Sequence, residues 1–475
     1  MSPNKPTNTG DDALNQIVAD TASCQNQINS FFVNQRIALF LTQSNMVKQC
    51  GIAPVVVMRF IFSLVFTGKN LFRYLQSDAS GGEIGKDTVY RFLNSVNTNW
   101  CKFLHLLSAA VISQEIRPLT SEQTPKVFIV DDSLYSRNRS KKVELLARGY
   151  DHNEKRYYCG FRLLTLGWSD GSTYLPVSFN LLSSANQKNR LVPMAEIDKR
   201  TNGYKRRVES LSKAPDALKE LVRQAHQSGI RADYLLFDSW FAFPSTIIGL
   251  LEQKQQVICM LKAMKTITYG YMGFDLTLND LYKNVRKRCG RAKILASILV
   301  ELGTDTKGVP VMAKIVFVRN RSTKKWLALL STDVNLADEE IIKLYKRRWD
   351  IEVFFKITKS YLRLAKEFQS RSYDALVAHT AIVFARYIML ELARRTNNDP
   401  RTLGTLFHAG CDELRQVSFD EAMAVLINHL QQQIKDLVKQ TTDPLMGILK
   451  DFVAQIPALL RQPMLLPACI FERSM

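Results

Sequence analysis

The chain has 475 residues, of which 46% are hydrophobic and 10% aromatic, so it can bury the cores of two to four domains and is not a disordered chain. Its 64 Lys and Arg residues outnumber its 44 Asp and Glu residues, and the net charge of +20 favours a polyanionic partner such as nucleic acid. A membrane partner is disfavoured, because the best apolar run, 55–66, is short and carries Arg59.

The cysteine pattern and the first residues indicate a cytoplasmic protein. The eight cysteines lie far apart and form no CxxC pair, which is typical of reduced thiols and not of a zinc site or a disulfide framework. Residues 1–20 are polar and lack the apolar core of a signal peptide, so we expect them to form a disordered tail.

Helices are predicted for the region that follows the tail. Apolar periodicity runs from about residue 30 to 115, and 70–77 and 87–96 flank a Gly-rich turn, with Asp87 as the predicted N-cap of the second helix. We assign 21–120 as a helical DNA-binding region, with an ordinary helical bundle as the alternative.

From about residue 125 the pattern changes to short apolar strands that alternate with helices. Strands are predicted at 126–132, 161–168, 173–182, 234–238 and 257–262, and helices at about 204–228 and 243–254. This order predicts a mixed α/β sheet.

A β-rich segment, 265–331, follows the mixed sheet. After it, the sequence 338–362 predicts a helix whose first turn is acidic, which suits the positive end of a helix dipole. The rest of the chain is predicted to be mostly helical, with breaks at 397–400 and 441–444.

Two of the predicted strands end in aspartate. Asp131 and Asp132 end one, and Asp238 ends the other. A carboxylate at the end of a buried strand is costly unless its charge is compensated, and a divalent cation does this directly. A helix cap or a turn is the alternative for either strand alone.

Four residues of the predicted helix 338–362, which we call the YREK residues, share one narrow stripe at about 100° per residue: Tyr345, Arg348, Glu352 and Lys359. A Glu flanked by Arg, Lys and a tyrosine hydroxyl suits a metal ligand beside groups that bind phosphate. The alternative is an Arg–Glu pair on a solvated face. With the two strand-end aspartates, the Glu predicts a three-carboxylate site for two Mg²⁺ ions that acts on phosphodiesters.

These residues resemble those of the DDE transposases of bacterial insertion sequences, specifically the insertion sequence 4 group. That group's Y-(2)-R-(3)-E-(6)-K signature is met without a gap by the YREK residues. IVDDS resembles its first acid motif and points to Asp131, with Asp132 left open, and LFDSWF resembles the second and gives Asp238.

The resemblance implies an RNase H-like α/β core in two parts, 121–264 and 332–395, interrupted by the β-rich insertion 265–331. It leaves 396–475 as a helical region that is a candidate for dimerisation. It also implies that Trp326, in the insertion, stacks on a flipped base; a core aromatic is the alternative.

The resemblance implies cut-and-paste transposition by two-metal-ion hydrolysis and strand transfer. Asp131, Asp238 and Glu352 would be the catalytic acids and would hold two Mg²⁺ ions, for which Mn²⁺ could substitute, and the other YREK residues would bind DNA phosphates. The partners would be double-stranded DNA, as terminal inverted repeats and target, and a second copy of the chain. A metal-dependent endonuclease without strand transfer and an inactive DNA-binding relative are the alternatives.

Overall fold

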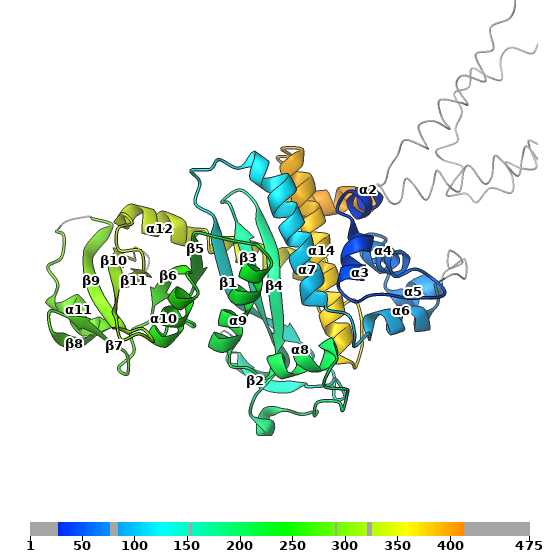
Figure 1. Ribbon diagram of the computed structural model, residues 1–475, viewed down its shortest axis with the longest axis horizontal. Helices are drawn as coiled ribbons and strands as arrows, with labels where there is room; N and C mark the ends of the chain where they lie inside the picture. The colour runs from blue at the N-terminus through cyan, green and yellow to red at the C-terminus, as the bar shows by residue number, and fades with distance from the viewer. Residues whose placement is uncertain (1–26, 77–83, 152–153, 290–291, 321–324, 413–475) are drawn as a thin grey trace, which may run out of the picture. The chain divides into compact units, whose positions relative to one another are not determined.

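The computed structural model describes residues 27–76, 84–151, 154–289, 292–320 and 325–412, and everything below concerns these residues (Figure 1). The predicted tail at 1–20 and most of the C-terminal region 396–475 lie outside them. The described residues belong to one compact unit.

The N-terminal region is helical. Its helices are α2 (Gln27–Asn34), α3 (Ile37–Gln43), α4 (Pro54–Leu64), α5 (Leu71–Leu75), α6 (Lys86–Leu93) and α7 (Trp100–Ala110), followed by a π-helical turn (Val111–Ile116) and a 3-10 turn (Arg117–Leu119). The prediction for Asp87 was wrong: Gly85 is the N-cap of α6, and Asp87 lies in its first turn, where a carboxylate favours the helix dipole without capping it.

One sheet runs through the rest of the described chain, in the order β2-β3-β1-β5-β6-β11-β10-β9-β7-β8, with β4 paired to β3. Its first strands are β1 (Val127–Ser136), β2 (Ala147–Asp151), β3 (Arg156–Ser169), β4 (Tyr174–Leu182), β5 (Tyr234–Phe237) and β6 (Gln256–Leu261). Strands β1, β5 and β6 are parallel, and β1 pairs antiparallel with β3. The predicted mixed α/β fold is therefore confirmed, and it is consistent with an RNase H-like core.

The β-rich segment extends this same sheet. Its strands are β7 (Thr268–Tyr271), β8 (Phe274–Thr277), β9 (Ile294–Thr304), β10 (Pro310–Arg319) and β11 (Trp326–Ser331), with helix α11 (Leu278–Asn284) between β8 and β9. Strand β11 pairs antiparallel with β6, so the segment is joined to the core by backbone hydrogen bonds.

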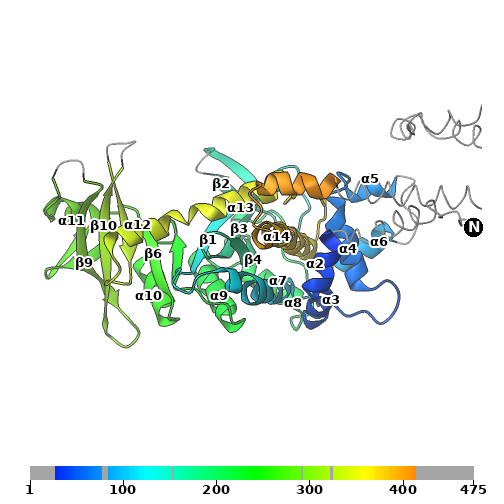
Figure 2. The same cartoon turned by 90° about the horizontal axis from the view of Figure 1, so that it is seen from above.

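Helices pack on the sheet, as Figures 1 and 2 show. They are α8 (Asn202–Ser210), α9 (Ala214–Gln227), α10 (Pro244–Glu252), α12 (Asp338–Lys346), α13 (Trp349–Ser360) and α14 (Tyr373–Thr396). Helix α14 is long and apolar enough to cross a membrane, but its whole apolar stretch is buried in the protein. A helix that is hydrophobic all round and buried in this way is typical of a core helix.

The single helix predicted for 338–362 is two helices. Helix α12 ends at Lys346 and α13 begins at Trp349, while Arg348 between them keeps αR dihedral angles (φ −53°, ψ −26°). The break is therefore small, and side chains four residues apart across it still meet.

Candidate active site

Asp131 and Asp238 lie side by side, although the prediction that Asp131 and Asp132 end their strand was wrong, because β1 continues through its pairing with β3 to Ser136. Asp131 is in β1, and Asp238 directly follows β5, the parallel neighbour of β1. Ile129 is in register with Leu236, so two residues further on Asp131 and Asp238 stand at the same level of the sheet.

Arg348 joins the first aspartate to the glutamate of α13. Its Nη1 donates to Oδ2 of Asp131 at 3.1 Å, and its Nη2 donates to Oε1 of Glu352 at 2.9 Å. The Asp131 and Arg348 side chains are each only 18% exposed, so the contact is shielded from water. One guanidinium thus lies between an acid from the sheet and an acid from the helix.

The surroundings of Asp131 and Asp238 do not fully compensate the negative charges of these two carboxylates. The pKa of Asp131 is raised to about 7, first by burial and then by the charge of Asp238, and Arg348 opposes this only in part. Burial also raises the pKa of Asp238, against the backbone N–H of Trp240 and the charge of Arg348. A pair of acids shifted in this way, beside a third acid, is typical of a functional site.

The donor atoms fit a hard divalent cation, although the side chains do not hold one as they stand. Among the described residues, no group of three or more Asp, Glu, His or Cys side chains is close enough together to bind a metal ion. The Arg348 guanidinium takes the position of a cation between Asp131 and Glu352. Carboxylate oxygens are the ligands that Mg²⁺ and Mn²⁺ prefer. A metal ion would therefore have to displace Arg348.

Asp132, the alternative first ligand, has a different partner. It forms an ion pair with Arg162 of β3, and that guanidinium lies 5.3 Å from the ring centroid of Trp240. Because successive residues of a strand point to opposite faces, Asp131 and Asp132 cannot share one partner equally. Asp131 is the aspartate that shares Arg348 with Glu352.

The other two YREK residues border the same site. Burial raises the pKa of Tyr345, and the charges of both Arg348 and Asp238 act on this hydroxyl. Lys359, in the last turn of α13, donates from Nζ to the Ser133 hydroxyl of β1 at 2.5 Å. The YREK residues therefore follow β1 from the acids to Ser133.

Trp326 belongs to a separate aromatic cluster. Its ring stacks on Tyr282 with centroids 4.7 Å apart and meets the edge of Phe317 at 5.3 Å. These contacts within the β-rich segment fit the core-aromatic alternative at least as well as a base-stacking role.

Three residues at the site were not predicted: Ser133, Arg162 and Trp240. Trp240 had a signal in the sequence, since it lies two residues after Asp238. Arg162 had a weaker one, as a lone charge in the apolar strand FRLLTLGW. The pairing of Arg162 with Asp132 depends on the β1–β3 register, which is a long-range property.

Comparison with known families is consistent with this geometry. Residues 212–389 match a family model described as "Transposase DDE domain", and residues 75–269 match one described as "DDE superfamily endonuclease". The first range includes Asp238 and Glu352, and the second includes Asp131 and Asp238. No curated protein matches the chain. The two family matches support a DDE transposase, a transposase-type nuclease that has DNA as its partner and belongs to a class that generally uses divalent metal ions.

Proposed function

We propose that the protein is a transposase of the insertion sequence 4 group that performs cut-and-paste transposition of its element. The observation that carries the proposal is the position of Arg348, which contacts Asp131 and Glu352 while Asp238 stands beside Asp131. Two acids that are remote in the sequence thus share one guanidinium, and a third stands beside the first of them.

Asp131, Asp238 and Glu352 would hold two Mg²⁺ ions, and Mn²⁺ would substitute. When bound, these ions would supply an activated nucleophile and stabilise the leaving oxygen of the phosphodiester. The chain's own part is to exclude water around the acids and to keep them within reach of one cation, which burial and Arg348 favour.

Tyr345, Arg348 and Lys359 would hold the phosphates of the DNA end. A guanidinium that leaves the acids when metal binds is free to form a bidentate contact with a phosphate. Lys359 offers a point charge at the other end of α13, so the two cations would fix one strand along the helix. The net charge of +20 favours this partner.

The reaction would use the terminal inverted repeats and then target DNA, in a synapse with a second copy of the chain. Strand transfer separates this function from the endonuclease alternative, because a nuclease has no need to retain the freed 3′-hydroxyl.

The proposal is tested by incubating purified protein and Mg²⁺ with DNA that carries the genomic ends of the element and with a supercoiled target plasmid. We expect nicks at the ends, followed by joined products in the target, and neither product with Asp131→Ala, Asp238→Ala or Glu352→Ala. Nicks without joined products would favour the endonuclease alternative, and binding without nicks would favour an inactive relative. End cleavage that persists in Asp238→Ala would overturn the proposed site.

A further inference from the structure

Strand β2 and the first residues of β3 form a two-stranded ribbon at one edge of the sheet, and Figure 2 shows β2 extending from the sheet near α13. Two tyrosines lie opposite each other on it: Tyr150 is in register with Tyr157, and their ring centroids are 5.1 Å apart. They are 42% and 63% exposed. Neighbouring aromatic rings exposed on a ribbon mark a contact surface.

A cation is stacked on this aromatic pair. The guanidinium of Arg148, also an exposed side chain, lies 4.2 Å from the ring centroid of Tyr157. This contact orders the arginine before any partner arrives. The Tyr150 and Tyr157 rings meet edge to face at 70°, so the ribbon presents a positive charge beside an exposed aromatic pair.

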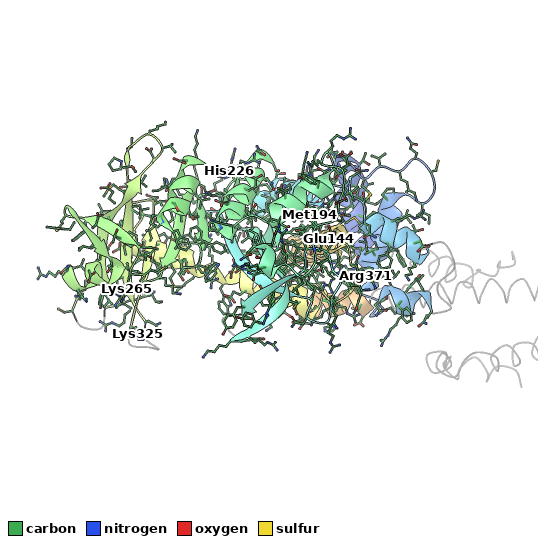
Figure 3. The ribbon with its side chains drawn as sticks, turned by 90° about the horizontal axis from the view of Figure 1, so that it is seen from below. Glu144, Met194, His226, Lys265, Lys325 and Arg371 are labelled. Carbon is green, nitrogen blue, oxygen red and sulfur yellow. The ribbon has the colours of Figure 1, made fainter. Side chains whose placement is uncertain are left out.

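The ribbon and the segment that leads into it are basic. Residues 137–158 contain seven Arg and Lys residues and three Asp and Glu residues. One of these acids, Glu144, is buried in a bidentate pair with Arg207, and its backbone N–H donates to the carbonyl of Arg371, near which it lies in Figure 3. Glu144 therefore does not belong to the exposed charge of the segment, which stays basic.

The outer end of the ribbon, where Asp151 pairs with Arg156 beside the turn, lies within electrostatic reach of the candidate active site. The charge of Asp151, the last residue of β2, acts on the Lys359 ammonium of α13. Tyr158 of β3 is likewise within electrostatic reach of both Asp132 and Arg162. The outer end of the ribbon is thus close to Lys359, the last of the YREK residues.

We propose that this ribbon is a DNA-binding arm that continues the line of YREK residues away from the acids. Arg148 binds a phosphate of the strand, Arg156 exchanges its ion pair with Glu154 for a second phosphate, and the ring of Tyr157 stacks on a base that is unpaired at the DNA end. The proposal rests on the proposed function for its partner. Nucleic acid suits the surface because a stacked guanidinium and an aromatic face recognise phosphates and bases together, whereas an acidic protein would leave the rings without a specific partner.

The test compares arm variants with matched controls in the full chain. Arg148→Ala and Tyr157→Ala, singly and together, are set against Arg223→Ala, an exposed arginine of α9, and Phe274→Ala, an exposed aromatic residue of β8. Affinity is measured over a range of salt for a short blunt duplex and for one with unpaired bases at its end.

We expect the double arm variant to bind the frayed duplex about ten-fold to a hundred-fold more weakly than wild type, because one stacking contact and one phosphate contact are lost. Arg148→Ala should weaken both duplexes and reduce the salt slope by about one, whereas Tyr157→Ala should weaken the frayed duplex more. The controls should match wild type, and all variants should keep its thermal midpoint.

Two results would contradict the proposal that the ribbon binds DNA, and they differ in what they mean for the proposed function. If wild type binds and cleaves DNA but the arm variants match the controls, the arm is wrong and the proposed function stands. If wild type binds neither duplex more tightly than a neutral polymer control, the proposed function fails, and the arm fails with it.

Discussion

Glu367 and Asp131 are both carboxylates withdrawn from water, but their surroundings shift their pKa values in opposite directions. Glu367 accepts from Arg386 at 2.6 and 3.0 Å and contacts His379 at 2.9 Å. Burial would raise the pKa of Glu367, yet these partners lower it to about 2. Burial raises the pKa of Asp131 to about 7, and its one guanidinium does not offset this.

The difference separates a structural charge from a functional one. Arg386 also donates to the carbonyls of Ile61 and Phe62, so the Glu367 cluster ties α4 to α14, and both carboxylate oxygens of Glu367 accept hydrogen bonds. Asp131 shares Arg348 with Glu352 and stands beside Asp238, so two acids share one guanidinium and a third acid lies beside them. A paired cluster holds elements together, whereas an uncompensated one is suited to binding a further cation.

The largest effect is expected from substitutions of the three acids of the candidate active site. Asp131→Asn, Asp238→Asn and Glu352→Gln should each slow DNA cleavage by about a thousand-fold or more, since each removes a ligand of ions that supply several kcal/mol to the transition state. Single-turnover nicking rates measure this. Circular dichroism should show an unchanged fold, and a loss of less than about ten-fold for any one of the three would remove that residue from the site.

Substitution of Glu367, the structural carboxylate, should change the stability of the protein instead. Glu367→Gln should lower the free energy of unfolding by about 3–5 kcal/mol, because it leaves Arg386 buried without its charge partner. Urea unfolding measures this. The control is Glu340→Gln, because Glu340 pairs with Lys343 on an exposed face, and its loss should change the free energy of unfolding by less than about 1 kcal/mol. Equal effects of the two variants would show that the buried cluster contributes no more than a surface pair.

The opposite pKa shifts predict opposite responses to pH in the metal-free protein. The pKa of Asp131 is raised in the folded state, so this group costs stability as the pH rises from about 4 through 7. Asp131→Asn should therefore stabilise the protein by roughly 2 kcal/mol at pH 8 and by little at pH 4, as measured by urea unfolding. The contribution of Glu367 should instead be lost as the pH falls from 4.5 towards 2. Asp131→Asn that destabilises the protein at pH 8 would mean that Arg348 compensates the acids fully.

The smallest effect is expected from removing the Arg348 guanidinium. Arg348→Ala should weaken binding to the element's end by about ten-fold and reduce the salt slope by about one, because one phosphate contact is lost. Fluorescence anisotropy over a salt series measures both. Unchanged affinity would limit Arg348 to its contacts with the acids.

Much of the core could be predicted from the sequence because its strands are short apolar runs. The residues from Val127 to Val130 are fully buried, and β5 and β6 have the same character. Strand β2, which reads ARGYD, was missed because it is polar and held mainly by its pairing with β3. The break between α12 and α13 was missed because its residues keep helical dihedral angles.

The candidate site was only partly predictable for a similar reason. Motif spacing selected the acids and the YREK residues, and the β1–β5 register brings the two aspartates to one level. The partners that distinguish Asp131 from Asp132 come from other elements, Arg348 for the first and Arg162 for the second. Contacts of this kind depend on how the strands and helices pack, which spacing along the chain does not encode.

The central claim is that Asp131, Asp238 and Glu352 bind a divalent cation. It is tested most directly by measuring Mn²⁺ binding to the metal-free full chain with electron paramagnetic resonance at pH 8. The account predicts that wild type and Asp132→Asn bind the ion, and that Asp131→Asn and Asp238→Asn bind it at least about ten-fold more weakly, because each has lost a charged ligand. Equal Mn²⁺ binding by wild type and Asp131→Asn would contradict it.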